Sequence, residues 1–101
     1  MWEIRVLGEA AQDIASAGDF YEGVEPGVGD YFSDSIIADL ERLVLSHGIH
    51  PRFFGLHRAL ADHFPFGIYY RETGMRTEII AVLDLRRDPA WIRSELTKRN
   101  G

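Results

Sequence analysis

The sequence contains no cysteine, so it can form no disulfide, no thiolate metal site and no cysteine nucleophile. It also lacks an apolar run of membrane-spanning length, and its first residues do not read as a basic leader. A chain without disulfides suits a reducing compartment. From these absences we expect a cytoplasmic protein that does not engage a membrane.

Basic residues are scarce in the first half of the chain. Residues 1–50 hold ten acids and two bases (−8), and residues 51–101 hold six acids and nine bases (+3), within a total of −5. An acidic chain is a poor non-specific ligand for nucleic acid, because that affinity scales with basic contacts. The basic half can still form a local patch, for nucleic acid or for an acidic protein segment.

Familiar catalytic and ligand-binding motifs are missing as well. The four histidines do not have the spacing of a zinc site, so we expect no metal and no other cofactor. The run Gly27-Val28-Gly29 follows no strand and lacks the Lys-Ser/Thr pair of a phosphate-binding loop, so we predict a plain turn. No nucleophile elbow accompanies the serines.

What is present predicts one domain over residues 1–101, with a modest core from 46% hydrophobic residues. Alternation in residues 2–7 predicts a half-buried strand. Apolar residues recur every three or four positions in residues 9–22, and again from residue 30 or 33 to about 48. These two helices, joined by a glycine-rich turn, form a hairpin that we expect to pack across one face of a sheet.

The second half of the chain predicts three strands and a short helix. Residues 56–63 suit a helix or a strand, and we choose a strand because the strand at 66–71 needs an antiparallel partner. After a turn at Gly74, residues 78–85 form a central strand, and Asp88-Pro89 begins the last helix. Strict alternation gives one face of the central strand to Ile79, Ala81, Leu83 and Leu85.

The predicted fold class is therefore α+β, in the order β-α-α-β-β-β-α. An N-terminal strand leads into an α-helical hairpin packed on a small, mainly antiparallel β-sheet, and a short C-terminal helix follows.

Arginines and tyrosines collect in the basic half: Arg58, Arg71, Arg76, Arg86, Arg87, Tyr69 and Tyr70. Strand pairing would bring Arg58 and Arg87 toward one end of the sheet. Arginine with tyrosine suits RNA phosphate binding and base stacking. The alternative is a solvated sheet margin with local Asp and Glu partners, which the residues alone favour.

Several motifs occur in a fixed order: Pro-Gly-x-Gly at 26–29, Gly-x-His-Arg at 55–58, Phe-Pro-Phe-Gly-Ile-Tyr-Tyr-Arg at 64–71, and Arg-Arg-Asp-Pro at 86–89 followed by Trp91. Their order and spacing resemble the RelE/ParE superfamily of toxins from type II toxin–antitoxin systems, often labelled plasmid stabilisation proteins. The resemblance covers nearly the whole chain. It implies a cytoplasmic, growth-inhibiting toxin that a cognate antitoxin neutralises in a hetero-oligomer.

One branch of that superfamily cleaves messenger RNA on the ribosome without a metal, and the other poisons DNA gyrase. The nuclease branch usually has a basic residue where this chain has Gly67, and often a tyrosine near its end, whereas none follows Tyr70 here. Arg87 matches the arginine at the end of the last strand. The resemblance thus implies a ParE-like toxin with a gyrase-type or unassigned target. The alternatives are a RelE-like endoribonuclease and a non-toxic interaction module with the same fold.

Three sets of candidate residues follow. For the nuclease alternative, the catalytic candidates are Arg58, Arg87 and Tyr70. The candidates for binding the target or a phosphate are Arg58, Arg71, Arg86 and Arg87. Trp91, Ile92 and Leu96 form the apolar face of the predicted last helix and are the antitoxin-binding candidates, although core packing is the favoured role for Trp91.

Overall fold

The computed structural model describes residues 2–100. Within them the elements are β1 (Glu3–Val6), α1 (Gly8–Val24), α2 (Val28–Ser46), β2 (Arg52–Phe53), β3 (Leu56–Leu60), β4 (Phe66–Thr73), β5 (Arg76–Asp84) and α3 (Pro89–Asn100). The strands form one sheet in the order β1-β5-β4-β3-β2, with β1 parallel to β5 and the other neighbours antiparallel. This arrangement confirms the predicted α+β class and the mainly antiparallel sheet.

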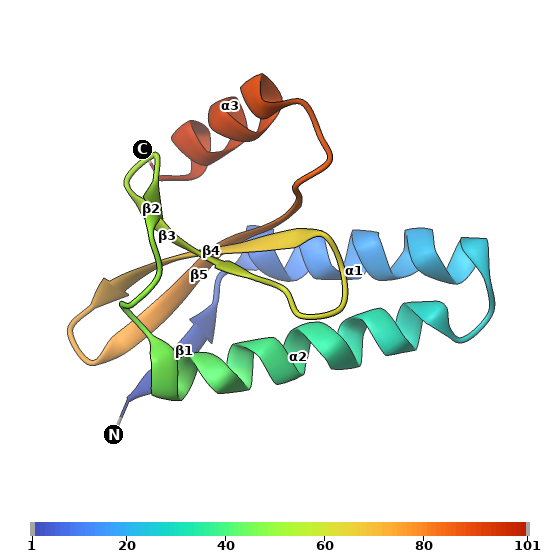
Figure 1. Ribbon diagram of the computed structural model, residues 1–101, viewed down its shortest axis with the longest axis horizontal. Coiled ribbons are helices and arrows are strands. Elements are labelled where there is room, and N and C mark those ends of the chain that lie inside the picture. Colours follow the sequence, from blue (N-terminus) through green and yellow to red (C-terminus); the bar gives the residue numbers. More distant parts are fainter. Residues whose placement is uncertain (1, 101) are drawn as a thin grey trace.

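The sheet is covered on both faces (Figure 1). The helical hairpin α1–α2 packs on one face and α3 on the other. The core under the hairpin includes Ala10, Phe32, Ile36, Leu40, Leu43, Ile68, Tyr70, Ile79 and Val82. The core under α3 includes Leu56, Tyr69, Ile80, Ala81, Leu83, Ile92 and Leu96. Because both faces are buried, the central strands β4 and β5 are almost continuously apolar, as predicted.

A β-bulge changes the predicted faces of β5. Tyr69 pairs with Ala81 and Tyr70 pairs with Ile79, so Ile80 is an extra residue that has no partner in β4. Ile79 therefore packs under the helical hairpin, although strict alternation had placed it on one face with Ala81. An extra residue in one strand shifts the side chains beyond it to the other face, so the predicted common face is wrong.

The turn of the helical hairpin is closed by a side chain. α2 begins at Val28, earlier than predicted, and the carboxylate of Glu22 accepts hydrogen bonds of 3.0 Å from the backbone N–H groups of Gly27 and Gly29. These bonds satisfy amide donors at the start of α2. A Cβ at Gly29 would lie 2.6 Å from the carbonyl oxygen of Gly18, so only glycine permits this close approach of the helices.

The β2–β3 hairpin is a feature that the sequence did not predict. Its turn residues, Phe54 and Gly55, have φ angles of 56° and 83°. A left-handed conformation costs a bulky residue about 1–2 kcal/mol, so Phe54 is a strained position in this turn. β3 ends at Leu60 rather than at the predicted residue 63, because the chain then leaves the sheet and Asp62 N–H donates to the Asp39 carboxylate at 3.2 Å.

The helix α3 begins as predicted. Pro89 is its first residue, and Asp88 Oδ1 accepts a hydrogen bond of 2.8 Å from Ala90 N–H. The missing N–H of proline leaves no donor unsatisfied at that position, and the carboxylate caps the next one. The predicted N-cap is confirmed.

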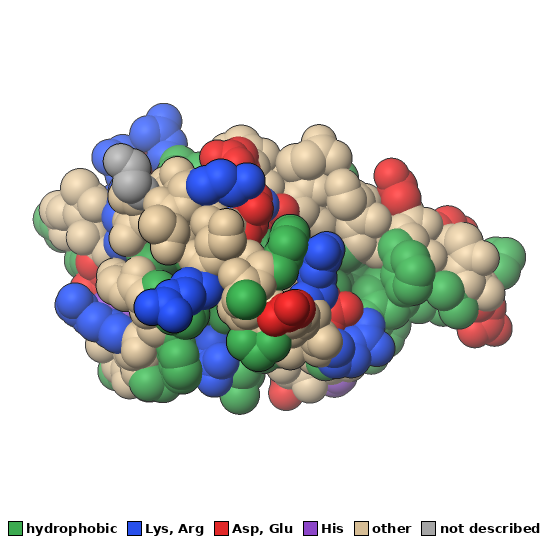
Figure 2. All heavy atoms as spheres, turned by 90° about the horizontal axis from the view of Figure 1, so that it is seen from above, with side chains coloured by type: hydrophobic (Ala, Val, Ile, Leu, Met, Phe, Trp, Pro, Cys, Tyr) green, Lys and Arg blue, Asp and Glu red, His purple; other side chains and the backbone are tan. Residues whose placement is uncertain are grey.

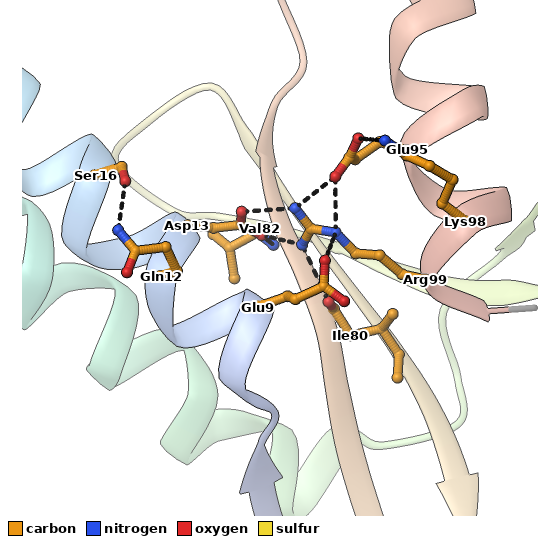
Figure 3. A network of polar contacts seen from close by, with 9 residues as sticks. All are labelled: Glu9, Gln12, Asp13, Ser16, Ile80, Val82, Glu95, Lys98 and Arg99. Atoms are coloured by element: carbon orange, nitrogen blue, oxygen red, sulfur yellow. Dashed lines mark hydrogen bonds and ion pairs between the residues drawn. The ribbon is translucent and has the colours of Figure 1, made fainter.

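At its other end, α3 is fastened by Arg99 (Figure 3). The guanidinium donates to Asp13 at 2.5 and 2.9 Å, to Glu95 at 3.1 Å and to the carbonyl oxygen of Ile80 at 3.3 Å. Asp13 also accepts a hydrogen bond of 2.9 Å from Val82 N–H. β1 does not extend along this part of β5. The side chains of Asp13 and Arg99 therefore form hydrogen bonds with backbone groups on this unpaired edge of the strand.

Candidate functional site

Two of the predicted arginines lie on the α3 side of the sheet, each against an aromatic ring. The guanidinium carbon of Arg58 is 3.8 Å from the ring centroid of Phe53, and that of Arg87 is 3.6 Å from the ring centroid of Trp91. Within residues 2–100 neither guanidinium has a carboxylate partner, and Arg58 Nε is buried without a hydrogen-bond partner. A ring beneath a guanidinium attracts the charge but leaves donor N–H groups at the edge.

The other two predicted arginines are in local ion pairs. Arg86 Nη2 lies 2.7 Å from Asp84 Oδ2, and Arg71 Nε lies 2.9 Å from Glu78 Oε1. The hydrogen bond from Arg86 lowers the pKa of Asp84 below its usual value, and the bond from Arg71 does the same to the pKa of Glu78. For these two arginines, the structure shows the local Asp and Glu partners that the residues alone had favoured.

Tyr70 is separated from Arg58 by the sheet itself. Its side chain is fully buried under the helical hairpin, whereas Arg58 lies on the α3 side. The hydroxyl accepts a hydrogen bond of 3.0 Å from Gly48 N–H and contacts His50 Nδ1. Burial raises the pKa of Tyr70 above its usual value. The predicted grouping of Tyr70 with the arginines is therefore corrected, because the strand sends this side chain to the opposite face.

The three predicted antitoxin-binding residues divide between core and surface. Ile92 and Leu96 belong to the core between α3 and the sheet, where their side chains are 7% and 0% exposed. Trp91 is only partly buried and lies at the edge of that core, beneath Arg87. As the chain is folded, only Trp91 of these three offers substantial surface to a partner.

Trp91 lines a cleft of about 300 Å³ between α1 and the segment that connects β5 to α3. The cleft is bounded by Asp13, Ser16, Ala17, Phe20, Tyr21, Phe66, Val82, Leu83, Asp84, Arg86, Arg87 and Trp91. We call it the α1–α3 cleft. Its lining combines four aromatic residues with charged groups of both signs.

The α3 side of the molecule is shown in Figure 2, where Lys and Arg side chains spread over the body, while the projecting hairpin carries acidic and apolar ones. Phe20, a cleft residue that is 63% exposed, was not among the residues singled out from the sequence. Phe20 and Val24 lie about one turn apart on α1, and both side chains are exposed. Exposed apolar residues at helical spacing beside a buried stripe were the signal that could have revealed this surface.

Neither a metal site nor a membrane span is found in the described part of the chain. No three His, Asp or Glu side chains among residues 2–100 are grouped to hold a metal ion. No helix in that range is long and apolar enough to cross a bilayer.

Comparisons with known proteins give an informative structural likeness. No protein-family model matches the sequence, and no curated protein matches it. Among solved structures, a chain of the chromosomal ParDE TA system from P. aeruginosa superposes with a TM-score of 0.72. The match covers 81% of this chain and 94% of that one, at 20% sequence identity.

The chain has a RelE/ParE-like fold. The predicted resemblance is thereby confirmed at the level of the fold. Within that fold, the α1–α3 cleft and the ring-stacked arginines are candidate surfaces for a partner.

Proposed function

We propose that this protein is the toxin of a type II toxin–antitoxin module, acts in the cytoplasm to inhibit growth, and is neutralised by a cognate antitoxin. The observation that carries the proposal is the likeness to a chain of the ParDE TA system over most of both chains. The motif order in the sequence supports it independently.

The α1–α3 cleft is the surface that we assign to the antitoxin. A partner helix or extended segment with a row of apolar side chains would bury Phe20, which is exposed, and Trp91, which is partly buried. Arg87, without a carboxylate partner in residues 2–100, would donate hydrogen bonds to an acidic side chain at the end of that segment. A segment that becomes ordered on binding can cover such a shallow, mixed surface.

The arrangement of the arginines supports a ParE-like toxin over a ribosome-dependent nuclease. A nuclease of the RelE type would need basic groups and a general acid or base around one phosphate. Here Tyr70 is buried on the opposite face, and Arg71 and Arg86 are held by carboxylates. A gyrase-type or unassigned target is therefore the better supported alternative, and DNA gyrase is the first target to test.

The deciding experiment is growth after induced expression of the full chain, with and without the neighbouring gene. We expect arrest that the neighbour relieves, with induction of a DNA-damage reporter before protein synthesis falls. Early loss of translation with cleaved messenger RNA would favour the nuclease. Normal growth with soluble, folded protein would overturn the proposal in favour of a non-toxic module.

Two variants test the assigned surface. Phe20→Asp puts a charge into the α1–α3 cleft, so the protein should remain toxic but escape the antitoxin. Leu45→Asp is the matched control, because Leu45 is 92% exposed on α2 and is not part of the cleft. Equal neutralisation of both variants would show that the antitoxin binds elsewhere.

A further inference from the structure

We infer that a second groove, on the outer side of α3, is a docking site for an acidic protein segment that carries a large apolar side chain. The groove is lined by Phe54, Pro89, Ala90, Arg93, Ser94, Thr97 and Lys98. It shares no residue with the α1–α3 cleft. The inference does not depend on the toxin proposal and is tested with the purified protein.

The first observation is the conformation of Phe54. This residue occupies the left-handed region, with φ 56°, where Asn or Gly would be unstrained, and it is still 48% exposed. Its ring is therefore not held there by burial. Backbone strain clusters at binding sites and switch regions, and an exposed apolar ring at such a position is available for contact with a partner.

The second observation is the charge of the groove. Its two charged lining residues, Arg93 and Lys98, are both basic. The guanidinium carbon of Arg93 lies 5.7 Å from the Phe54 ring centroid, and Arg93 has no carboxylate partner within residues 2–100. The carboxylates of the helix and its cap are engaged, Asp88 by Ala90 N–H and Glu95 by Arg99 and Lys98.

The third observation is the pattern of neighbouring arginines. Arg58, on the strand that follows the Phe54 turn, also lies on an aromatic ring and lacks a carboxylate. The hairpin thus presents two successive phenylalanines, each with an arginine near its face. An anionic partner would find guanidinium donors that the protein itself does not use.

An acidic peptide fits this surface better than a nucleic acid does. The lining of the groove includes the apolar residues Phe54, Pro89 and Ala90, which suit contact with one hydrophobic side chain. It has only two cations on its rim, whereas nucleic-acid affinity rests on many phosphate contacts, and the chain as a whole carries −5. Charge complementarity therefore points to a segment of Asp and Glu around an apolar anchor.

The test uses the full chain and a synthetic peptide of about ten residues, long enough to span the groove. The peptide is made of Asp and Glu with a central Leu, and binding is followed by amide NMR shifts and by fluorescence anisotropy. We expect saturable binding that weakens with salt, with shifts centred on Arg93, Ser94 and Thr97. Replacing the central Leu by Ser, or the acids by their amides, should weaken binding.

Phe54→Asn separates docking from folding. Asn tolerates the left-handed conformation, so this variant should unfold at the same or a higher temperature while binding the peptide about tenfold more weakly. Arg93→Gln should reduce affinity and its salt dependence together. A destabilised Phe54→Asn protein that binds normally would make Phe54 a packing residue and overturn the inference. So would the absence of saturable binding, or tighter binding of an oligouridylate than of the peptide.

Discussion

The Arg99 network makes the sharpest prediction, because one side chain fastens α3 to α1 and to β5 (Figure 3). In Arg99→Met the aliphatic stem is kept and the charge is lost. Asp13, whose side chain is 13% exposed, then loses its counter-charge, while Glu95, 16% exposed, keeps only Lys98. The carbonyl oxygen of Ile80 also loses a donor. Removing one partner of a buried ion pair costs about 3–5 kcal/mol.

We expect the lower end of that range, about 3 kcal/mol, because Asp13 keeps its bond from Val82 N–H and neither acid is fully buried. For a domain whose total stability is about 5–15 kcal/mol, this is a large loss. Urea unfolding at neutral pH, followed by tryptophan fluorescence and circular dichroism, would measure it. Arg93→Met, on the same helix but without an ion pair in residues 2–100, is the control and should change stability by about 0.5 kcal/mol or less.

The double variant Asp13→Asn/Arg99→Met decides whether the ion pair itself is responsible. It should be less destabilised than the sum of the two single variants, since each single change strands a charge that the double change removes. The pH dependence of stability gives a second test. Burial alone would raise the pKa of Glu95, but hydrogen bonds from Arg99 hold this pKa below 4.5. The stabilisation from this pKa shift is present above about pH 4.5 and is lost as the pH falls further. In Arg99→Met, the free energy of unfolding should therefore change less with pH in that range. A loss under about 1 kcal/mol, or strict additivity, would refute the reasoning.

Three further changes test other parts of the structure. Gly29→Ala should destabilise the protein by about 1–3 kcal/mol in urea unfolding, because the added methyl meets the backbone of α1, whereas Gly23→Ala meets nothing within 4 Å and should be neutral or stabilising. Tyr70→Phe should cost about 1–2 kcal/mol by stranding a backbone N–H, yet leave growth arrest intact, and loss of arrest in a stable variant would show a functional tyrosine. Burial, and then a neighbouring histidine, lower the pKa of His50 below 6.5, so its contribution to stability is complete above pH 6.5 and is lost as the pH falls below it. Between pH 6.5 and 5.5, His50→Gln should lose less stability than the wild type, whereas the control His63→Gln should lose as much as the wild type. An equal loss in His50→Gln and the wild type would contradict this account.

Local sequence signals predicted the framework well. Alternation and helical periodicity report which side of an element is buried, so the order of elements apart from β2, the central position of β4 and β5, and the cap at Asp88 followed from the residues. The β-bulge at Ile80 escaped the same reasoning, because alternation carries no mark of an inserted residue. That single insertion explains why the faces assigned to β5 were wrong although the strand itself was right.

The candidate site was harder to predict, since its partners come from distant parts of the chain. Arg99 meets Asp13 across 86 positions, and Tyr70 meets His50 across 20. An arginine beside an acid in the sequence, such as Arg86 near Asp84, does find that acid, which is why the local pairs were anticipated. Interactions that depend on the packing of helices against the sheet leave no signature in neighbouring residues.

The position of α3 connects the two proposed surfaces. One side of the helix borders the α1–α3 cleft through Trp91, and its outer side forms the second groove through Arg93. Few buried side chains hold the helix, chiefly Ile92 and Leu96, so the Arg99 network contributes much of its attachment. Under conditions where Arg99→Met remains folded, α3 should therefore be less firmly placed and both surfaces should weaken together. Loss of peptide binding with antitoxin binding intact would show instead that the two surfaces are independent.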